Sequence, residues 1–226
     1  MDPMVMLGIA AVVIPSITSH EAAHGFAADR LGDDTARSLG RLTLNPIPHI
    51  DPFLTVLLPA LLLLMGSPIL FGGAKPVPVR VQRLHHPRRD WAIVGAAGPL
   101  TNLLIAVALS MVVLIAVRIF GFTPESVLIQ VCAVGIYFNV LLCVFNLVPI
   151  PPLDGSRVVQ LFLSDRALAA YHRLERFGLL VIVALLVLFP TVQLLLAMLV
   201  RDVTLAITVP FGIAEIVEAG LQSLFR

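Results

Sequence analysis

Residues 4–24 read MVMLGIAAVVIPSITSHEAAH, so an apolar run ends in the pentapeptide HEAAH at positions 20–24. Side chains four residues apart share one face of an α-helix. If the helix continues through the pentapeptide, His20 and His24 can converge on one metal ion, with Glu21 beside them to accept a proton from water. Such groups are costly next to hydrocarbon and are rarely kept without a role. The stretch therefore predicts a zinc site on a membrane helix, with a pair of structural helix histidines as the alternative.

The composition agrees with a membrane location. Hydrophobic residues make up 58% of the chain, charged residues make up 13%, and the mean hydropathy is +0.98. Soluble domains carry about 25% charged residues, so the composition predicts an all-α polytopic membrane protein in a lipid bilayer. We expect residues 1–226 to form a single integral-membrane domain. The net charge of +1 gives no indication of a nucleic-acid partner.

Apolar stretches give the predicted order of membrane elements. They cover residues 4–28, 52–71, 91–118, 125–148, 177–200 and 203–225. Each is about long enough to cross roughly 30 Å of hydrocarbon. The stretch 52–71 differs because Pro59, Gly66 and Pro68 interrupt it, so a re-entrant element competes with a sixth span.

The positive charges favour the re-entrant alternative. If residues 52–71 enter and return, Arg118 and Arg201 lie on one side, and the other 13 of the 15 Lys and Arg residues lie on the opposite side. A simple crossing gives the weaker split of 10 to 5 among the same 15 residues. Because Lys and Arg are concentrated in cytoplasmic loops, we expect about five transmembrane helices, with the N-terminus outside and the C-terminus inside.

Two non-helical segments are predicted beside the metal helix. Residues 38–44 alternate imperfectly and precede Asn45-Pro46, which predicts a short β-strand ending in a turn. The prolines in residues 75–81 predict a second extended piece. Non-helical backbone near a membrane needs partners from protein or water, so we expect both segments to lie over the metal site.

A catalytic zinc ion usually has three protein ligands and one open position. The metzincin pattern is excluded, because it requires glycine and histidine where Ala27 and Arg30 stand. No glutamate occurs between Glu21 and Glu125, so the third ligand is expected to be an aspartate or a histidine. The sequence offers as candidates Asp29, Asp33, Asp34, His49, Asp51, His85, His86, Asp90 and Asp154.

Asp154 stands out among these candidates because it closes the segment NLVPIPPLDG at residues 146–155. Three prolines force this backbone out of helical shape directly after a long apolar helix. An aspartate in such a place needs a cation or another partner. A helix N-cap for a segment starting at Ser156 is the structural alternative.

Together these features resemble the site-2 protease family of intramembrane zinc metalloproteases. The resemblance rests on HEAAH, on Gly98-Pro99-Leu100-Thr101-Asn102 and on residues 146–155, and it spans most of residues 10–160. Residues 45–51 and 73–79 are also similar to the compact bacterial-type branch. That branch has an extra apolar segment between the first two motifs, and we expect no PDZ or CBS domain.

The resemblance implies a zinc metalloendopeptidase with one Zn²⁺ per chain. His20, His24 and Asp154 would ligate the ion, and Glu21 would be the general base. The substrates would be membrane proteins with a single transmembrane segment, cut within or next to that segment in regulated intramembrane proteolysis. The expected location is the cytoplasmic (inner) membrane of a bacterium, with the active site toward the cytosol.

Other residues receive secondary roles from the same resemblance. Asn102 and Asn146 would bind the substrate backbone or stabilise the oxyanion, with helix–helix hydrogen bonds as the alternative. His49 would line the site or be an ordinary loop histidine. Independently of the resemblance, the place of strand 38–44 just after the metal helix suggests that an extended substrate could pair with its edge. Leu42→Pro should then weaken cleavage while leaving the zinc content intact.

Two other functions compete with the protease. An inactive homologue that binds membrane proteins has no need of the base Glu21, which argues against it. A metal-ion transporter should carry polar residues on facing helices, and residues 177–200 offer few. The sequence makes no prediction of the oligomeric state.

Overall fold

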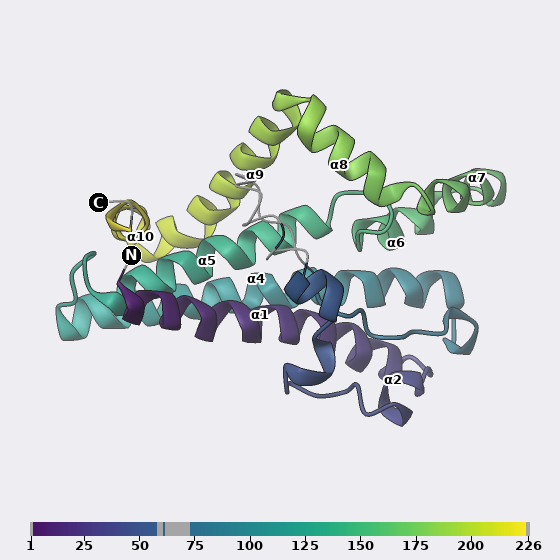
Figure 1. Cartoon of the computed structure of the whole chain (residues 1–226), viewed down its shortest axis with the longest axis horizontal. Coiled ribbons are helices and arrows are strands. Elements are labelled where there is room, and N and C mark those ends of the chain that lie inside the picture. The colour runs from purple at the N-terminus through teal and green to yellow at the C-terminus, as the bar shows by residue number, and fades with distance from the viewer. Residues whose placement is uncertain (1, 58–60, 62–72, 225–226) are drawn as a thin grey trace.

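The computed structural model describes residues 2–57, 61 and 73–224, and every regular element in these residues is a helix (Figure 1). The long helices are α1 (Pro3–Arg30), α4 (Pro87–Phe120), α5 (Val127–Asn146) and α9 (Pro190–Thr208). The shorter α-helices are α2 (Thr35–Ser38), α6 (Gly155–Val159), α7 (Asp165–Glu175), α8 (Gly178–Leu188) and α10 (Ala214–Ser223). The remaining turns are the 3₁₀-helices η1 (Ile47–His49), η3 (Val81–Arg83), η4 (Gln160–Phe162) and η5 (Val209–Phe211), with the π-helix η2 (Pro52–Leu57).

Four helical segments among the described residues are long and apolar enough to cross a membrane. They are Pro3–Arg30, Pro87–Phe120, Val127–Asn146 and Pro190–Phe211. Their length and composition agree with the predicted all-α polytopic membrane protein. The prediction for residues 52–71 lies largely outside the described residues, which include only Pro52–Leu57 and Leu61 of that stretch.

The bounds predicted for the last two apolar stretches are wrong. Residues 177–200 are divided because Pro190 lacks an N–H group and starts a new helix, so α8 ends at Leu188. Residues 203–225 are divided at Gly212, whose left-handed φ of 64° separates η5 from α10.

The strand predicted at residues 38–44, all of which the structure describes, is also wrong. Ser38 ends α2, and Gly40 follows with a left-handed φ of 66°. The N–H of Arg41 then bonds to the carbonyl of Ala36 at 2.8 Å, which closes the end of the helix. The imperfect alternation of apolar and polar residues over 38–44 predicted a strand, but Gly40 forms the end of a helix instead.

Side chains, rather than a backbone ladder, hold the segment that follows α2. The Arg41 guanidinium donates to the carbonyl of Lys75 at 2.8 Å. Leu42 packs on Gly25 of α1, where an added Cβ would lie 2.7 Å from Leu42 Cδ2. Leu42 is therefore a packing residue, and the strand edge on which the substrate-pairing hypothesis rests is not present in this segment.

Helices α1, α4 and α5 lie side by side and form the centre of the molecule (Figure 1). Small residues allow the close approach, since a Cβ on Gly135 would lie 2.7 Å from Leu109 and from Val12. Buried residues from α4, α5, α9 and η5–α10 form one apolar cluster: Ala106, Val113, Ala116, Ile129, Cys132, Ala133, Ile136, Val140, Val200, Ile213 and Val217. Helices α8 and α9 form an inverted V that rises away from this centre.

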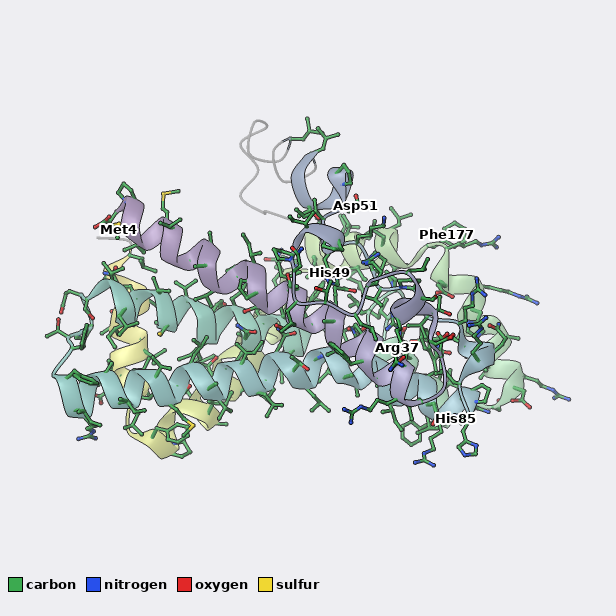
Figure 2. The ribbon with its side chains drawn as sticks, turned by 90° about the horizontal axis from the view of Figure 1, so that it is seen from below. Met4, Arg37, His49, Asp51, His85 and Phe177 are labelled. Carbon is green, nitrogen blue, oxygen red and sulfur yellow. The ribbon has the colours of Figure 1, made fainter. Side chains whose placement is uncertain are left out.

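The irregular segments gather toward one end of the long axis. Met4 lies at the opposite end, whereas Arg37, His85 and Phe177 lie toward the irregular end, with His49 between (Figure 2). The HEAAH pentapeptide lies in the C-terminal half of α1, on the side of these segments. The fold therefore surrounds the candidate metal helix with both membrane helices and non-helical chain.

Candidate metal centre

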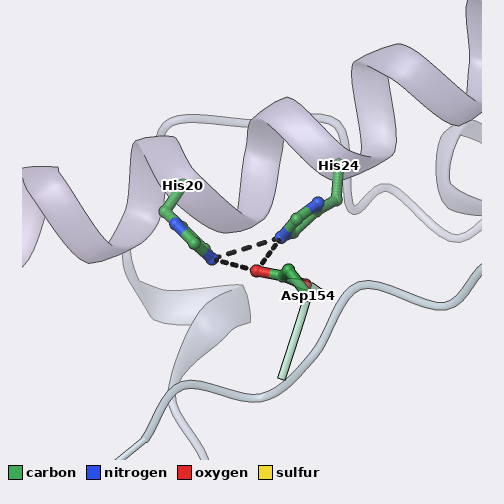
Figure 3. Close-up of side chains that lie close together, drawn as sticks. All are labelled: His20, His24 and Asp154. Carbon is green, nitrogen blue, oxygen red and sulfur yellow. Dashed lines mark hydrogen bonds and ion pairs between the residues drawn. The ribbon is translucent and has the colours of Figure 1, made fainter. Parts of the chain in front are cut away.

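The two histidines of HEAAH lie one turn apart on α1 and are buried, with 6% and 4% of their surface exposed. Asp154, from the loop after α5, lies against both rings (Figure 3). Its Oδ2 is 3.1 Å from Nε2 of His20 and 3.2 Å from Nε2 of His24, and the two Nε2 atoms are 3.2 Å apart. The structure thus brings together residues that are 134 positions apart in sequence.

The three side chains fit a zinc ion. Among the described His, Cys, Asp and Glu residues they form the one group that could hold a metal, with all ligand atoms within 4.8 Å of one another. Tetrahedral ligands at roughly 2.0 Å from a shared ion lie about 3.3 Å apart, close to the separations found here. Two imidazole nitrogens and a carboxylate are also a donor set that catalytic zinc uses.

The Nδ1 atom of each imidazole makes a hydrogen bond on the side away from Asp154. Nδ1 of His20 donates to Oδ1 of Asn102 at 2.5 Å, and Nδ1 of His24 donates to the carbonyl of Val94 at 2.7 Å. Such contacts fix the tautomer and the ring orientation, so Nε2 of each ring is free to bind a metal. Asn102 therefore lies behind His20 in this structure, and its side chain is fully buried.

Two glycines of α4 make room for the site. A Cβ on Gly98 would lie 2.5 Å from Nε2 of His24 and 2.7 Å from Cε1 of His20. A Cβ on Gly95, one turn earlier, would lie 2.9 Å from the carbonyl oxygen of Asp154. Glycine is therefore needed at position 98 of the Gly98-Pro99 motif, because any larger residue would collide with the two imidazoles.

Arg157 binds the second oxygen of the Asp154 carboxylate. Its Nη1 lies 3.1 Å from Oδ1, and its guanidinium lies over the ring of Trp91 at 4.5 Å from the centroid. Burial raises the pKa of the Asp154 carboxyl, but its close contacts with the His20 and His24 rings and the positive charge of Arg157 lower that pKa by more. Arg157 therefore occupies Oδ1, and Oδ2 is directed at the histidines.

The proline-rich loop places Asp154 directly before α6, where the chain packs closely against itself. Asp154 stands directly before α6, as the N-cap alternative required, but its side chain makes no capping hydrogen bond. Gly155 permits a close approach of the chain, because a Cβ there would lie 2.1 Å from the carbonyl oxygen of Leu147. The Asp154 carboxylate therefore contacts the histidines and Arg157 and does not cap the start of α6.

Glu21 is half-buried and does not join the group of three. Its Oε2 accepts a hydrogen bond from the backbone N–H of Val77 at 3.0 Å. Pro76 and Pro78 have no N–H, so Val77 is the single donor of this short run. The segment predicted to lie over the metal helix thus contacts the candidate base.

The other predicted site residues, Asn146 and His49, do not belong to the group of three. Asn146 donates from Nδ2 to the carbonyl of Leu142 in its own helix at 3.0 Å. His49 is buried and donates from Nε2 to the carbonyl of Thr43 at 3.0 Å, while its own carbonyl accepts from the N–H of Lys75. His49 therefore supports the segment that carries Val77.

Sequence reasoning did not identify Arg157, Trp91 or the N–H of Val77. Arg157 had a signal, since it follows Asp154 by three positions, the spacing of a pair on one helical turn. The Val77 contact joins residues 56 positions apart and depends on a backbone atom, so no side-chain pattern could reveal it.

Several known proteins that are similar to this chain are named zinc metalloproteases. The sequence profile of "Peptidase family M50" matches residues 114–189. The Bacillus subtilis protein named "Putative zinc metalloprotease YwhC" is 37% identical over 179 residues, which cover 77% of this chain and 78% of that protein. No solved structure was found to match.

Two mycobacterial proteins extend the comparison. "Putative zinc metalloprotease Rip2" of Mycolicibacterium smegmatis is 33% identical over 189 residues, 82% of this chain and 70% of that protein. The protein of the same name from Mycobacterium tuberculosis strain H37Rv is 34% identical over 192 residues, 83% and 70% respectively. The chain therefore belongs to the M50 peptidases, the site-2 protease family of zinc metalloproteases, and is an integral membrane protein.

Proposed function

We propose that this protein is an endopeptidase that hydrolyses membrane-protein substrates within or next to a transmembrane segment. The observation that carries the proposal is the buried group of His20, His24 and Asp154 on and beside α1, a helix long and apolar enough to cross a membrane. Glu21 stands next to this group in sequence and is half-buried. A peptide bond that reaches these side chains would be cut at the level of the membrane.

His20, His24 and Asp154 would hold the zinc ion, and Glu21 would move the proton. When bound, zinc supplies a Lewis acid that polarises the carbonyl and acidifies water. The Glu21 carboxylate takes a proton from water, whose oxygen bonds to the carbonyl carbon of the peptide. The C–N bond then breaks, and Glu21 returns the proton to the leaving nitrogen. The N–H of Val77 would hold the carboxylate in place during these transfers.

A helical substrate must unwind before it can react, because the carbonyls in a helix are bonded within it. We propose substrates with a single transmembrane segment. The basic residues support an active site toward the cytosol, since cytoplasmic segments carry the excess of Lys and Arg and the connection after the metal helix contains Arg30, Arg37 and Arg41. A cysteine placed at exposed Arg37 should react with an impermeant thiol reagent only from the cytosolic side.

The test is cleavage of a tagged single-span protein in proteoliposomes. Wild type should cut it, a strong chelator should stop cleavage, and added zinc should restore it. Glu21→Gln should lower the rate by roughly 10²–10⁴ while the zinc content stays at one ion per chain, because this glutamate is not a ligand. Equal cleavage by wild type and Glu21→Gln would refute the assigned chemistry.

The same proteoliposomes separate the competing functions. An inactive binding protein would retain the substrate on a pull-down without cutting it. A transporter would move zinc into vesicles that contain an indicator dye. Either result without cleavage would replace the endopeptidase proposal.

A further inference from the structure

Asn139 is a fully buried amide in the apolar helix α5, and it lies two hydrogen bonds from the metal group. Polar groups in membrane helices are costly and are expected to have a role. We propose that Asn139 is a positioning residue of the metal centre, which fixes the proton of His20 on Nδ1 and so keeps Nε2 free for zinc. This inference rests on the proposed function, because it takes His20 as a zinc ligand.

The backbone carbonyl of Gly135 sets the orientation of the Asn139 amide. This oxygen can only accept a hydrogen bond, so the Asn139 atom 2.8 Å away must be the amide nitrogen Nδ2. The same Nδ2 donates to Oγ of Ser16 at 2.8 Å. Oδ1 of Asn139 is therefore turned toward Asn102.

Asn139 sets the orientation of Asn102 in turn. Oδ1 of Asn139 can only accept, so the Asn102 atom 2.8 Å away must be Nδ2. Nδ2 of Asn102 also points to the carbonyl of Ser16, at 3.5 Å. Oδ1 of Asn102 therefore faces Nδ1 of His20 at 2.5 Å and requires a proton there.

The proton on Nδ1 decides whether His20 can bind a metal. A neutral imidazole carries one proton, so a proton on Nδ1 gives Nε2 a free lone pair toward Asp154. Without Asn139, only the long contact of 3.5 Å to the Ser16 carbonyl opposes a turn of the Asn102 amide, which would present its NH₂ group to His20. The proton then moves to Nε2, where it competes with zinc.

The same hydrogen bonds join α1, α4 and α5, so a purely structural role predicts a different result. The two roles separate in zinc affinity, measured on the detergent-solubilised full chain by competition with a chromophoric chelator. Asn139→Leu keeps the branch at Cγ and removes the acceptor, so it should weaken zinc binding ten- to hundredfold. Asn139→Asp keeps a carbonyl acceptor and should remain within about threefold of wild type.

Two serines provide matched controls. Ser16→Ala removes one acceptor of Asn139 Nδ2, but Gly135 still fixes the amide, so zinc affinity should change less than about threefold. Ser110 is also fully buried and donates to its own helix at Ala106, outside this network. Ser110→Ala should leave zinc affinity unchanged.

A double-mutant cycle keeps the inference testable if Asn139→Leu is unstable. When ionised, the carboxylate introduced by Asn102→Asp presents an acceptor to His20 in either orientation, so Asn139 is no longer needed to orient it. In that background Asn139→Leu should lower zinc affinity less than threefold. A full ten- to hundredfold loss in that background would overturn the inference, as would unchanged affinity in the single variant. Absence of zinc binding by wild type would instead refute the proposed function.

Discussion

The metal-bearing half of the molecule and its C-terminal half use membrane helices in opposite ways. Helix α5 buries nine residues and packs against both α1 and α4, whereas α9 buries only Val200 and Thr208. The tightly packed half holds the Asn102–His20 contact and the Asp154 group, whereas α8 in the loosely packed half is entirely apolar. In a membrane protein, close packing and hydrogen bonds hold the side chains of the site in place, while exposed apolar side chains can contact lipid.

The largest expected effect comes from filling the space beside the histidines. Gly98→Ala places a Cβ 2.5 Å from Nε2 of His24, so it should lower zinc affinity more than about a hundredfold. Thermal stability of the metal-free protein should not fall in parallel, because alanine favours a helix by about 1 kcal/mol over glycine. Metal analysis of the purified protein and thermal unfolding measure the two effects.

Gly220 of α10 offers the matched control in the C-terminal half. A Cβ there would lie 3.3 Å from Ile129 and 3.4 Å from Ala133, far from the metal group. Gly220→Ala should leave zinc content unchanged. Equal zinc loss in both variants would show that packing in the C-terminal half affects the metal group as strongly as packing beside the histidines.

The next effect comes from the partner of the carboxylate ligand. Arg157→Ala removes the contact to Oδ1 of Asp154 and should weaken zinc binding about tenfold. Arg157→Lys should recover part of the loss. Arg83→Ala breaks an exposed pair with Asp34 and should have no effect on zinc affinity, measured by the same chelator competition.

A smaller effect on rate, without loss of metal, is expected at the segment over α1. Val77→Pro deletes the N–H that Glu21 accepts and should reduce kcat about tenfold, a fraction of what a general base contributes. KM and zinc content should stay the same. Val77→Ala removes more packing but keeps the N–H, so a larger loss of kcat in this control would disprove the role of the donor.

The smallest effect is expected on the exposed face of α9. Leu194 is 60% exposed, so Leu194→Ala should change the free energy of unfolding by less than about 0.5 kcal/mol and leave cleavage unaltered. Steady-state cleavage in proteoliposomes measures this. A strong loss of cleavage would show that the loosely packed half takes part in catalysis or in substrate entry.

Much of the site was predictable from the sequence because its signals are local. Four-residue spacing places His20 and His24 on one helix face, and three prolines mark the loop that carries Asp154. The strand at 38–44 failed because a left-handed glycine ended α2 and side chains took over its contacts. The C-terminal helices had wrong bounds because Pro190 and Gly212 outweighed continuous hydrophobicity.

The amino-acid order alone determined the membrane class, the metal helix and the types of side chain available, since these follow from hydropathy and helical periodicity. Only the tertiary structure decided which atoms meet. It placed the Asp154 carboxylate between two imidazoles, put Asn102 behind His20, and set Val77 against Glu21. These contacts join residues 56 to 134 positions apart, and packing of whole helices, not local preference, brings such residues together.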